Sequence, residues 1–548
     1  MAGQRLERIL DALLDEESFC TPLMRVFLKE AQTLKPMETA EAPWEHDLET
    51  ASACLAYPAP IRYEGDRGRE IRNQSMRSWD RFPESFKADL SDLLGRASPA
   101  AARFRALRLD LGLSLSEMDD KETRASRDSS NRNDKRQKFR MNVRDVLEKA
   151  EQADMTQVWQ SLIHYGEGLD RLLSDCHDWQ HNPQLMEMPC IAGDAWFPEG
   201  IIYAAQTPFG MVLVGGVGDN IYPAGDAFLI MDLGGDDTYF FDEAFLSPED
   251  KGKRTFCSTV VDLSGNDHYS GEDGCVAAGM LGYRTILDFE GDDRYSASEL
   301  GLGAGIMGAG ILVDCSGNDL YTSKAFSLGA GAYGLGLLMD GHGDDEYRAS
   351  FMSQGFAGPS GLGCLVDDSG EDLYICIPAK LADLTLTFRR VSNDRPEPMP
   401  TFSQGCSASL THSGRAGLGM LIDLNGDDCY RAGDSSQGMA SGHGIGLLLD
   451  GRGYDFYNGQ DQCQGFGEEG GIGIHRDLMG NDHYIAHNNA QGVGAGNSLG
   501  MLIDDSGNDL YYAFENAQGR NRDNGTGILF DLKGDDQFLS KKETSKTE

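Results

Sequence analysis

Aspartate is the residue whose type and spacing in this sequence point most clearly to chemistry. An eight-residue pattern, D-x-x-G-x-D-x-Y, occurs eleven times between residues 232 and 538, with Phe538 in place of tyrosine in the last copy. Carboxylate oxygens are ligands that Ca²⁺ prefers, so both aspartates of the pattern are candidate metal ligands. The first aspartates of the copies are Asp232, Asp262, Asp288, Asp314, Asp340, Asp367, Asp423, Asp450, Asp477, Asp504 and Asp531. The second aspartates are Asp237, Asp267, Asp293, Asp319, Asp345, Asp372, Asp428, Asp455, Asp482, Asp509 and Asp536.

The copies recur at nearly constant intervals. Successive first aspartates lie 30, 26, 26, 26, 27, 56, 27, 27, 27 and 27 residues apart, and the double interval indicates an insertion near 376–403. A unit of this length cannot bury its own core and must stack on its neighbours. Each unit contains short apolar runs bounded by Gly and Asp, which are typical of strands and tight turns. Residues 200–540 are therefore predicted to form a parallel β-solenoid, or β-helix, of about 11–12 turns, with a degenerate first turn at Gly218–Tyr222.

Stacking brings the aspartates of different turns close together. Parallel strands lie about 4.8 Å apart, so eleven turns give a rod roughly 50 Å long with each carboxylate near its copies. Two carboxylates at that distance repel by about 1 kcal/mol in water, and by more where they are buried. One interpretation is that each aspartate accepts backbone hydrogen bonds in its own turn, as in Asx-turns. The other is that Ca²⁺ lies between adjacent loops, where about ten ions would cancel about 20 negative charges.

The loops also resemble a known family of repeats. Gly235-Asp236-Asp237-Thr238-Tyr239 and Gly507-Asn508-Asp509-Leu510-Tyr511 are similar to the second half of the RTX nonapeptide, G-G-x-G-x-D-x-U-x. In that family the repeat forms a calcium-loaded β-roll, so the resemblance implies that the second aspartates are ligands and the tyrosines point inward. The leading Gly-Gly is absent, and one loop occurs per 26–27 residues. The resemblance covers about five residues per turn and implies calcium, but not a β-roll or a toxin activity.

Other columns of the repeat favour structural roles. The glycine between the two aspartates occurs in all eleven copies, which indicates a left-handed backbone or a close approach of the next turn. The tyrosines are expected to pack inward, and Phe538 indicates that one position does not need a hydroxyl. Five glutamines, each followed by Gly, are expected to form a ladder of stacked amides. These glutamines are Gln354, Gln437, Gln464, Gln491 and Gln518.

Few residues of the repeat region are unique, and none forms a catalytic motif. His475 and Arg476 replace apolar residues of their column, which indicates either a break exposed to solvent or part of a site. The insertion carries a basic group of residues between Leu381 and Pro400, a candidate docking loop. His268 and His483 follow second aspartates and are expected at the surface. There is no nucleophile elbow, P-loop or H-E-x-x-H.

Residues 1–195 have a different character and are predicted to form a helical domain. Apolar residues at helical spacing predict a helix at the N-terminus, and Thr21-Pro22 predicts the start of another. Pro83 opens a helix that is expected to stop near Gly95, Ser98-Pro99 opens a third, and two more fill 140–176. Residues 119–138 are predicted to be a polar loop and 541–548 a polar tail. His164, His177 and His181 have acidic neighbours, but their spacing fits no metal-ligand pattern.

Composition limits the classes of partner. Residues 1–195 hold 27 Lys and Arg against 35 Asp and Glu, a balance of −8 that leaves −32 of the total −40 for the rest. Such a surface repels nucleic acid and anionic membranes, and no apolar run is long enough to span a bilayer. The twelve cysteines include no C-x-x-C pair. If the N-terminus is native, a cytoplasmic location with free thiols is expected; a removed leader would instead indicate an extracellular or periplasmic protein.

The sequence therefore predicts a helical N-terminal region followed by a calcium-stabilised acidic β-solenoid. Its expected role is structural, adhesive or partner-binding, with a protein or a polysaccharide as the partner and no assigned catalytic residue. One alternative is a polysaccharide-active lyase or hydrolase with a parallel β-helix fold. Another is an intracellular assembly scaffold whose aspartates bind no metal.

Overall fold

The structure is a computed structural model that describes Leu55 and residues 66–110, 156–174, 179, 182–193, 198–241, 257–378, 400–411 and 414–540. The predicted N-terminal helices, the polar loop 119–138, most of the insertion and the tail 541–548 lie outside the described residues. Two compact units are distinguished. Unit 1 comprises the described residues within Met1–Ser114, Ala153–His268 and Leu281–Glu290, and unit 2 those within Leu115–Gln152, Tyr269–Met280 and Gly291–Glu548.

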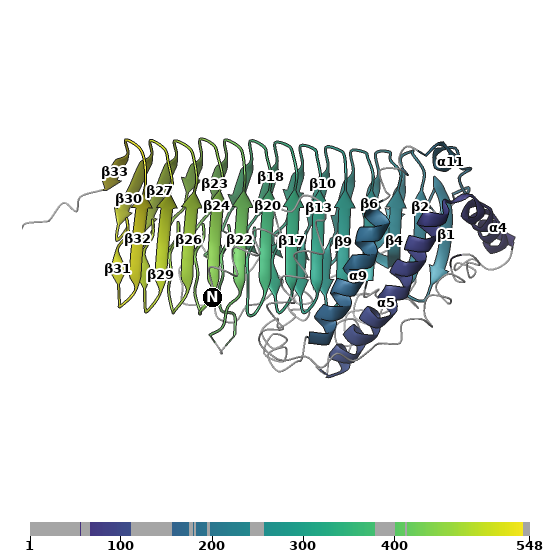
Figure 1. Cartoon of the computed structure of the whole chain (residues 1–548), viewed down its shortest axis with the longest axis horizontal. Coiled ribbons are helices and arrows are strands. Elements are labelled where there is room, and N and C mark those ends of the chain that lie inside the picture. The colour runs from purple at the N-terminus through teal and green to yellow at the C-terminus, as the bar shows by residue number, and fades with distance from the viewer. Residues whose placement is uncertain are drawn as a thin grey trace, which may run out of the picture. The chain divides into compact units, whose positions relative to one another are not determined.

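The helices belong to unit 1 (Figure 1). They are α4 (Asp66–Arg81), α5 (Glu84–Asp110), α9 (Thr156–Ser174) and the short α11 (Pro183–Met186). The predicted break between Gly95 and Pro99 is wrong, because α5 continues through both residues. Proline lacks one backbone donor, which disfavours it inside a helix. However, Leu90, Leu93, Leu94 and Ala97, which lie around Gly95, are buried, and that packing favours one continuous helix. No helix in the described part of the chain is long and apolar enough to cross a membrane.

The strands of unit 1 form the first turns of a β-solenoid. One sheet has the order β1-β2-β4-β6-β9, in which only the β1–β2 pair is antiparallel. The strands β3 and β5 form a parallel pair, in which Tyr222 aligns with Tyr239 and confirms the degenerate first turn. The bounds are β1 (Ile201–Thr207), β2 (Gly210–Gly215), β3 (Ile221–Pro223), β4 (Ala227–Asp232), β5 (Thr238–Phe240), β6 (Cys257–Asp262) and β9 (Tyr283–Asp288), with a 3-10 turn at Ala224–Asp226. The strand β7 (His268–Gly271) falls at the boundary between the units in the chain.

Unit 2 repeats the same two kinds of strand, turn after turn. Its first sheet contains β13 (Ala309–Asp314), β17 (Leu335–Asp340), β20 (Leu362–Asp367), β22 (Leu418–Asp423), β24 (Ile445–Asp450), β26 (Ile472–Asp477), β29 (Leu499–Asp504) and β32 (Thr526–Asp531). Its second sheet contains β10 (Arg294–Ala297), β14 (Leu320–Thr322), β18 (Glu346–Ala349), β21 (Leu373–Cys376), β23 (Cys429–Arg431), β25 (Phe456–Asn458), β27 (His483–Asn488), β30 (Leu510–Glu515) and β33 (Gln537–Ser540).

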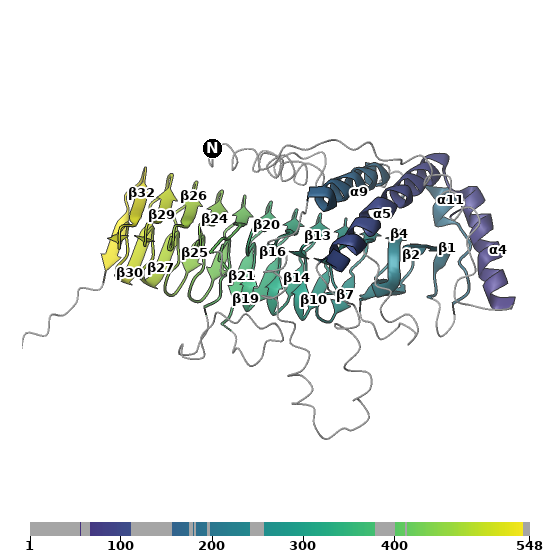
Figure 2. The same ribbon diagram turned by 90° about the horizontal axis from the view of Figure 1, so that it is seen from below.

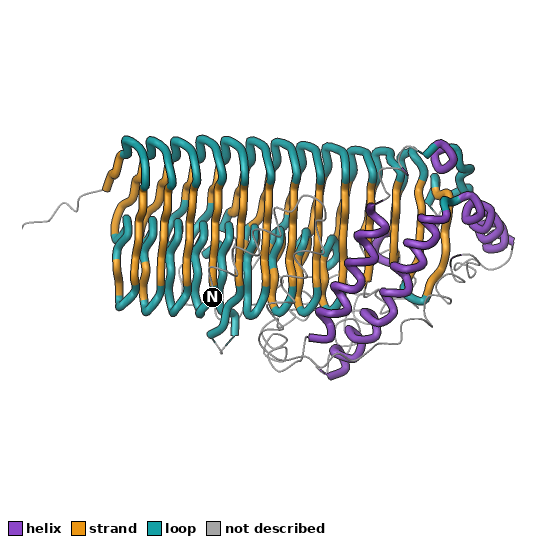
Figure 3. Tube along the Cα trace, viewed as in Figure 1, coloured by secondary structure: helices purple, strands orange, loops and turns teal. Residues whose placement is uncertain are grey.

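Smaller sheets lie between the long ones in several turns of unit 2, and isolated bridges take their place in others. The smaller sheets are formed by β8 (Ala278–Met280), β12 (Ala304–Ile306) and β16 (Gly331–Ala332), by β11 (Glu299–Gly301), β15 (Ala325–Ser327) and β19 (Phe351–Ser353), and by β28 (Gly494–Ala495) with β31 (Asn521–Arg522). Figure 2 shows the two long sheets of unit 2 as separate layers, and Figure 3 shows how short loops join the strands of successive turns. The predicted fold class, a helical N-terminal region followed by a parallel β-solenoid, is confirmed.

A column of aromatic rings fills the interior next to the loops. In unit 2 the tyrosines from Tyr269 to Tyr511 are buried, and each ring stacks on the next with centroids 4.7–4.9 Å apart. The repeat keeps the rings in register because parallel pairing aligns each tyrosine with its copy, as Tyr347 aligns with Tyr374. The inward orientation that the resemblance implied for the tyrosines is therefore confirmed.

Candidate functional site

The strand register aligns the first aspartates of successive turns. Each of these aspartates is the last residue of its strand, and in unit 2 Asp340 pairs with Asp367, which pairs with Asp423. In unit 1 Asp232, Asp262 and Asp288 are aligned in the same way. The glycine of each loop permits this stacking, since a Cβ atom on Gly370 would collide with the carbonyl oxygen of Gly343 in the preceding turn. Close approach, one of the two roles predicted for the glycine column, applies at Gly370, and the positive φ angles of Gly235 (125°) and Gly343 (153°) show that the backbone role applies in other turns.

In five turns the first aspartate accepts hydrogen bonds from two sources, whereas the buried Oδ1 atoms of Asp340, Asp450, Asp477 and Asp504 have no donor among the described residues. The Oδ1 atom of Asp367 accepts the backbone N–H of Ser369, two residues later, at 3.1 Å, as in an Asx-turn. Its Oδ2 atom accepts the hydroxyl of Tyr347 from the preceding turn at 2.6 Å. The same pair of bonds recurs in other turns, for example at Asp423, which accepts Asn425 N at 3.2 Å and the Tyr374 hydroxyl at 2.7 Å. The Asx-turn interpretation therefore holds for these first aspartates.

Most second aspartates are bonded on one oxygen only, although Asp237 also accepts the Tyr239 hydroxyl at 3.5 Å. The Oδ1 atom of Asp372 accepts the backbone N–H of Asp345 in the preceding turn at 2.7 Å, so this column connects neighbouring turns. The other oxygen, Oδ2, is buried and has no hydrogen-bond donor in seven of these residues. They are Asp319, Asp345, Asp372, Asp428, Asp455, Asp482 and Asp509. Backbone donors thus satisfy only half of each of these carboxylates.

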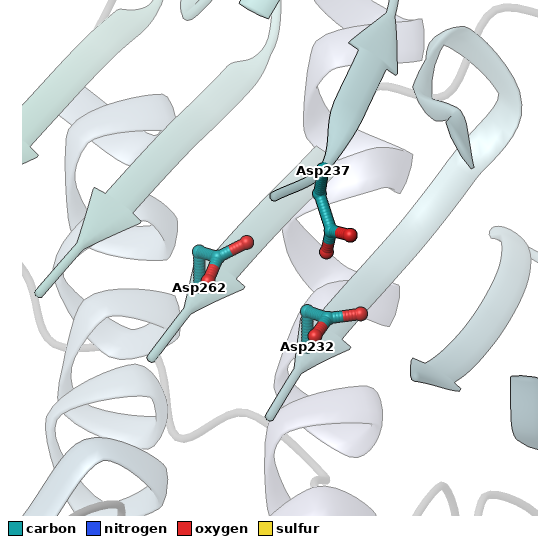
Figure 4. Close-up of side chains that lie close together, drawn as sticks. All are labelled: Asp232, Asp237 and Asp262. Atoms are coloured by element: carbon teal, nitrogen blue, oxygen red, sulfur yellow. The ribbon is translucent and has the colours of Figure 1, made fainter. Parts of the chain in front are cut away.

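The two columns meet between turns. Figure 4 shows the carboxylates of Asp232, Asp237 and Asp262 directed toward one another, with one oxygen from each within 4.8 Å of the others. Three more groups with this spacing lie within single units: Asp262, Asp267 and Asp288; Asp319, Asp340 and Asp345; and Asp345, Asp367 and Asp372. The structure thus brings the predicted site residues together in repeated groups of three.

Burial makes these groups electrostatically unusual. The predicted ligands from Asp232 to Asp509 are all at most 2% exposed, whereas Asp531 and Asp536 in the last turn are half-buried. Desolvation, and then repulsion from Asp423, raises the pKa of Asp428 to about 11. Desolvation also raises the pKa of Asp423 itself, although the hydroxyl of Tyr374 opposes that shift. A buried pair of carboxyl groups in this position does not carry two negative charges without compensation.

Two kinds of positive charge can compensate such a pair. In the first, the pair holds one proton, which bridges the donor-free Oδ2 atom and the neighbouring first aspartate. In the second, a divalent cation lies among the three carboxylates and keeps them all ionised. The residues fit a hard cation in ligand type, charge and unsatisfied oxygens. Ca²⁺ takes six to eight oxygens, so carboxylates from two adjacent turns would have to share each ion.

A third polar column was missed in the sequence. The residue between the glycine and the second aspartate is Asp or Asn in nine of the eleven copies. Its Oδ1 atom accepts the backbone N–H of the same position in the following turn, as Asp344 does from Glu371 at 3.0 Å. This column is exposed at Asp344, which distinguishes it from the two buried columns. The high share of Asx at this position was the signal that could have revealed it.

The role of the tyrosine hydroxyl was also missed. In seven turns of unit 2 the hydroxyl donates to the first aspartate of the next turn at 2.5–2.8 Å, whereas the Tyr511 hydroxyl has no partner among the described residues. Phe538 was the signal that could have revealed this role. It lies in the last described turn, and no further described turn supplies an aspartate that a hydroxyl could reach. The packing role that we expected is correct but incomplete.

His475 and Arg476, the two residues that are atypical of their column, lie in different environments. His475 is fully buried between Tyr457 and Tyr484, with ring centroids 4.4 and 5.5 Å away, and neither ring nitrogen has a hydrogen-bond partner. Arg476 faces solvent and pairs with Asp505 at 2.6 Å. The expected break exposed to solvent is therefore correct for Arg476 and wrong for His475. Adjacent residues of a strand point to opposite faces, which explains the difference.

The remaining candidates are structural or lie outside the described residues. The glutamines do not bond to one another, since Gln464 Nε2 donates to the backbone carbonyls of Tyr457 and Ile485 at 3.3 and 3.2 Å. His164 contacts Arg96 at 2.8 Å and Glu167 at 3.7 Å, in an ion-pair network between α5 and α9. His268 and His483 are exposed, as expected. His177 and His181 lie outside the described residues.

Comparisons with known proteins add no family to this description. No protein-family model, no curated protein and no solved structure matches the chain. The RTX resemblance consequently rests on the loop residues alone.

Proposed function

We propose that the chain is a structural, partner-binding scaffold whose β-solenoid is stabilised by divalent cations, with Ca²⁺ as the first candidate. One observation supports this most directly: the buried Oδ2 atoms of seven second aspartates, from Asp319 to Asp509, have no donor among the described residues, and carboxylates of the two columns lie within 4.8 Å of one another. Burying an unpaired carboxylate is costly, and a cation relieves the repulsion in several turns at once. The partner is a protein or a polysaccharide that accepts a repetitive acidic surface.

The enzyme alternative has lost the feature that favoured it. The pair His475 and Arg476 suggested a site on the solenoid, but the imidazole of His475 lies in the core, out of reach of a polysaccharide. The metal-free scaffold differs from the proposal only in what neutralises the aspartates. It predicts bound protons in place of bound cations, and the same experiment distinguishes the two.

The experiment is thermal melting of the full chain in EGTA, in excess Ca²⁺ and in excess Mg²⁺. We expect Ca²⁺ to raise the melting temperature in proportion to the logarithm of its concentration above the dissociation constant, because it binds only the folded stack. The variant Asp345→Asn removes a ligand from two carboxylate groups and should reduce the rise. The matched control Asp344→Asn removes the same charge one residue away in the exposed column and should leave the rise unchanged. A melting temperature that is identical in EGTA and Ca²⁺ would remove the cation from the proposal.

A further inference from the structure

The last turn of unit 2 exposes an apolar end. Four apolar side chains within ten residues of one another are 46–58% exposed: Phe530, Leu532, Phe538 and Leu539. The ring of Phe538 stacks on Tyr511 at 4.6 Å and has no described neighbour on its other face. In the turns before it, the corresponding tyrosines are fully buried. This end therefore presents the interior of the solenoid to its surroundings.

The same turn also presents open strand edges. Within the described residues, β32 pairs only with β29 and β33 only with β30, so backbone donors and acceptors on their outer sides face no strand. Proteins normally protect such edges with proline, lysine, bulges or a covering element. Neither β32 (TGILFD) nor β33 (QFLS) contains proline or lysine.

Unit 1 shows what a protected terminal strand looks like in this protein. There β1 pairs antiparallel with β2, and side chains of the helical region cover it, with Trp79 and Phe82 both 5.5 Å from the ring of Tyr203. The Tyr203 hydroxyl is further bonded to the carbonyl of Leu55 at 2.6 Å. Solenoids require such caps for solubility.

From these observations we infer that the open end of unit 2 binds a second copy of this chain, end to end. A two-fold axis normal to the long sheets pairs β32 antiparallel with its own copy, and it brings the Phe538 rings of both copies into one apolar contact. Charge favours this arrangement over a parallel one. The acidic loop of the last turn, with Asp531, Asp535 and Asp536, follows β32, whereas the exposed Arg520 precedes it. Antiparallel pairing places the arginine end of one copy beside the acidic end of the other.

The test is the mass of the full chain in solution, measured by sedimentation or light scattering over a range of concentrations. We expect a dimer that dissociates on dilution, and the variant Phe538→Lys should raise the dissociation constant at least about tenfold. The control Tyr454→Lys changes an aromatic residue that is 64% exposed elsewhere in unit 2, and it should not affect association. A second pair of variants covers the case in which Phe538→Lys locally unfolds β33. Arg520→Glu should weaken the dimer, and adding Asp535→Arg should restore it.

Three outcomes would overturn the inference. The first is a chain that stays monomeric up to about 100 µM, an upper limit for a specific weak dimer. The second is a dimer that neither Phe538→Lys nor Arg520→Glu weakens, since that dimer would use another surface. The third is a monomer in which the β32 amides that do not bond to β29 are protected from hydrogen exchange, because another segment of the same chain, such as the apolar residues of 1–18, would then cover this end.

Discussion

At the scale of single residues, the two aspartates of each loop make different hydrogen bonds within and between turns. The first aspartate closes its own turn and receives a tyrosine hydroxyl from the turn before, as Asp367 does from Tyr347. The second receives a backbone N–H from the preceding turn and leaves an oxygen without a donor. Every turn is therefore tied to its neighbours by side chains as well as by the strands. Within the described residues, buried oxygens without a donor remain on second aspartates, as at Asp345 Oδ2, and in some turns also on first aspartates, as at Asp340 Oδ1.

Removal of one tyrosine hydroxyl tests the bond between turns. The substitution Tyr347→Phe keeps the stacked ring but leaves the buried Oδ2 atom of Asp367 without its 2.6 Å donor. A lost hydrogen bond to a buried charged acceptor is expected to lower the free energy of unfolding by about 1.5–3 kcal/mol. Chemical denaturation measures this, with Tyr454→Phe, an exposed tyrosine, as the control. Equal stabilities of the two variants would show that the hydroxyl contributes nothing.

Replacement of the buried histidine should stabilise the protein. Burial lowers the pKa of His475 to about 3, and its neighbours in the strand register are Leu448 and Leu502. The variant His475→Leu removes two unsatisfied nitrogens and completes an apolar column, so we expect about 1–3 kcal/mol of added stability. The histidine protonates in the unfolded chain below its ordinary pKa but stays neutral when folded, so the gain should increase as the pH falls from 6.5. A loss of stability at every pH would mean that His475 has a hydrogen-bond partner outside the described residues.

Residue-level predictions from the sequence succeeded where a column was uniform. The aspartate and tyrosine columns fixed which residues meet, because parallel stacking in register is the only way to bury a 27-residue repeat. The environment of His475 was not predicted, because one atypical residue in a repeat does not reveal whether the chain exposes or buries it. Alternation along the strand, with Arg476 outward and His475 inward, was the information that we did not use.

At the scale of elements, the short loop between a strand of the first sheet and a strand of the second determines the stacking distance. The glycine of that loop lies directly against the carbonyl oxygen of the glycine one turn earlier. Each loop thus supports the next, and a side chain at this position would separate adjacent turns.

Two alanine substitutions in this column test the role of the loop. A Cβ atom at Gly370 would collide with the Gly343 carbonyl oxygen, whereas one at Gly218, in the degenerate first turn, meets nothing within 4 Å. We expect Gly370→Ala to cost about 1–3 kcal/mol through overpacking. Gly218→Ala should leave stability unchanged or slightly increase it, since alanine restricts the unfolded chain. Thermal melting of both variants decides, and equal melting temperatures would contradict the close-approach role.

The elements differed in how far the sequence could predict them. The strands of the first sheet from β4 onward were predictable, because each of them ends at the first aspartate of a repeat. The extent of α5 was not, since the local signals of Gly95 and Pro99 favour a break, while the burial of Leu93, Leu94 and Ala97 favours continuity. Tertiary packing outweighed local propensity in that helix.

At the scale of the whole molecule, the central question is how a chain with a net charge of −40 buries so many carboxyl groups. Desolvation raises the pKa of the second aspartates from Asp319 to Asp509, for example to about 10 at Asp319 and at Asp482. Without cations the folded protein therefore binds protons that the unfolded chain releases. Cations at the same positions would replace these protons, and the cation-bound fold would then require ionised carboxylates.

The pH dependence of stability follows with a defined sign. The aspartates have raised pKa values when folded, so the folded state binds more protons than the unfolded state between the ordinary pKa of 3.8 and the raised values. In EGTA the melting temperature should accordingly fall as the pH rises from about 5 to about 9. Excess Ca²⁺ should flatten or reverse that slope. A melting temperature in EGTA that rises over the same interval would show that the buried aspartates are compensated by something other than protons.

The most direct test of the account is the metal content of the purified chain. The protein is equilibrated with Ca²⁺, separated from free ions by gel filtration, and analysed for metal and protein in the same sample. The account predicts several tightly held Ca²⁺ ions per chain, of the order of one for each pair of adjacent loops, that is about ten, and loss of most of them after treatment with EGTA. Less than one ion per chain, together with a fully folded protein, would contradict it and leave shared protons as the means by which the stacked aspartates are tolerated.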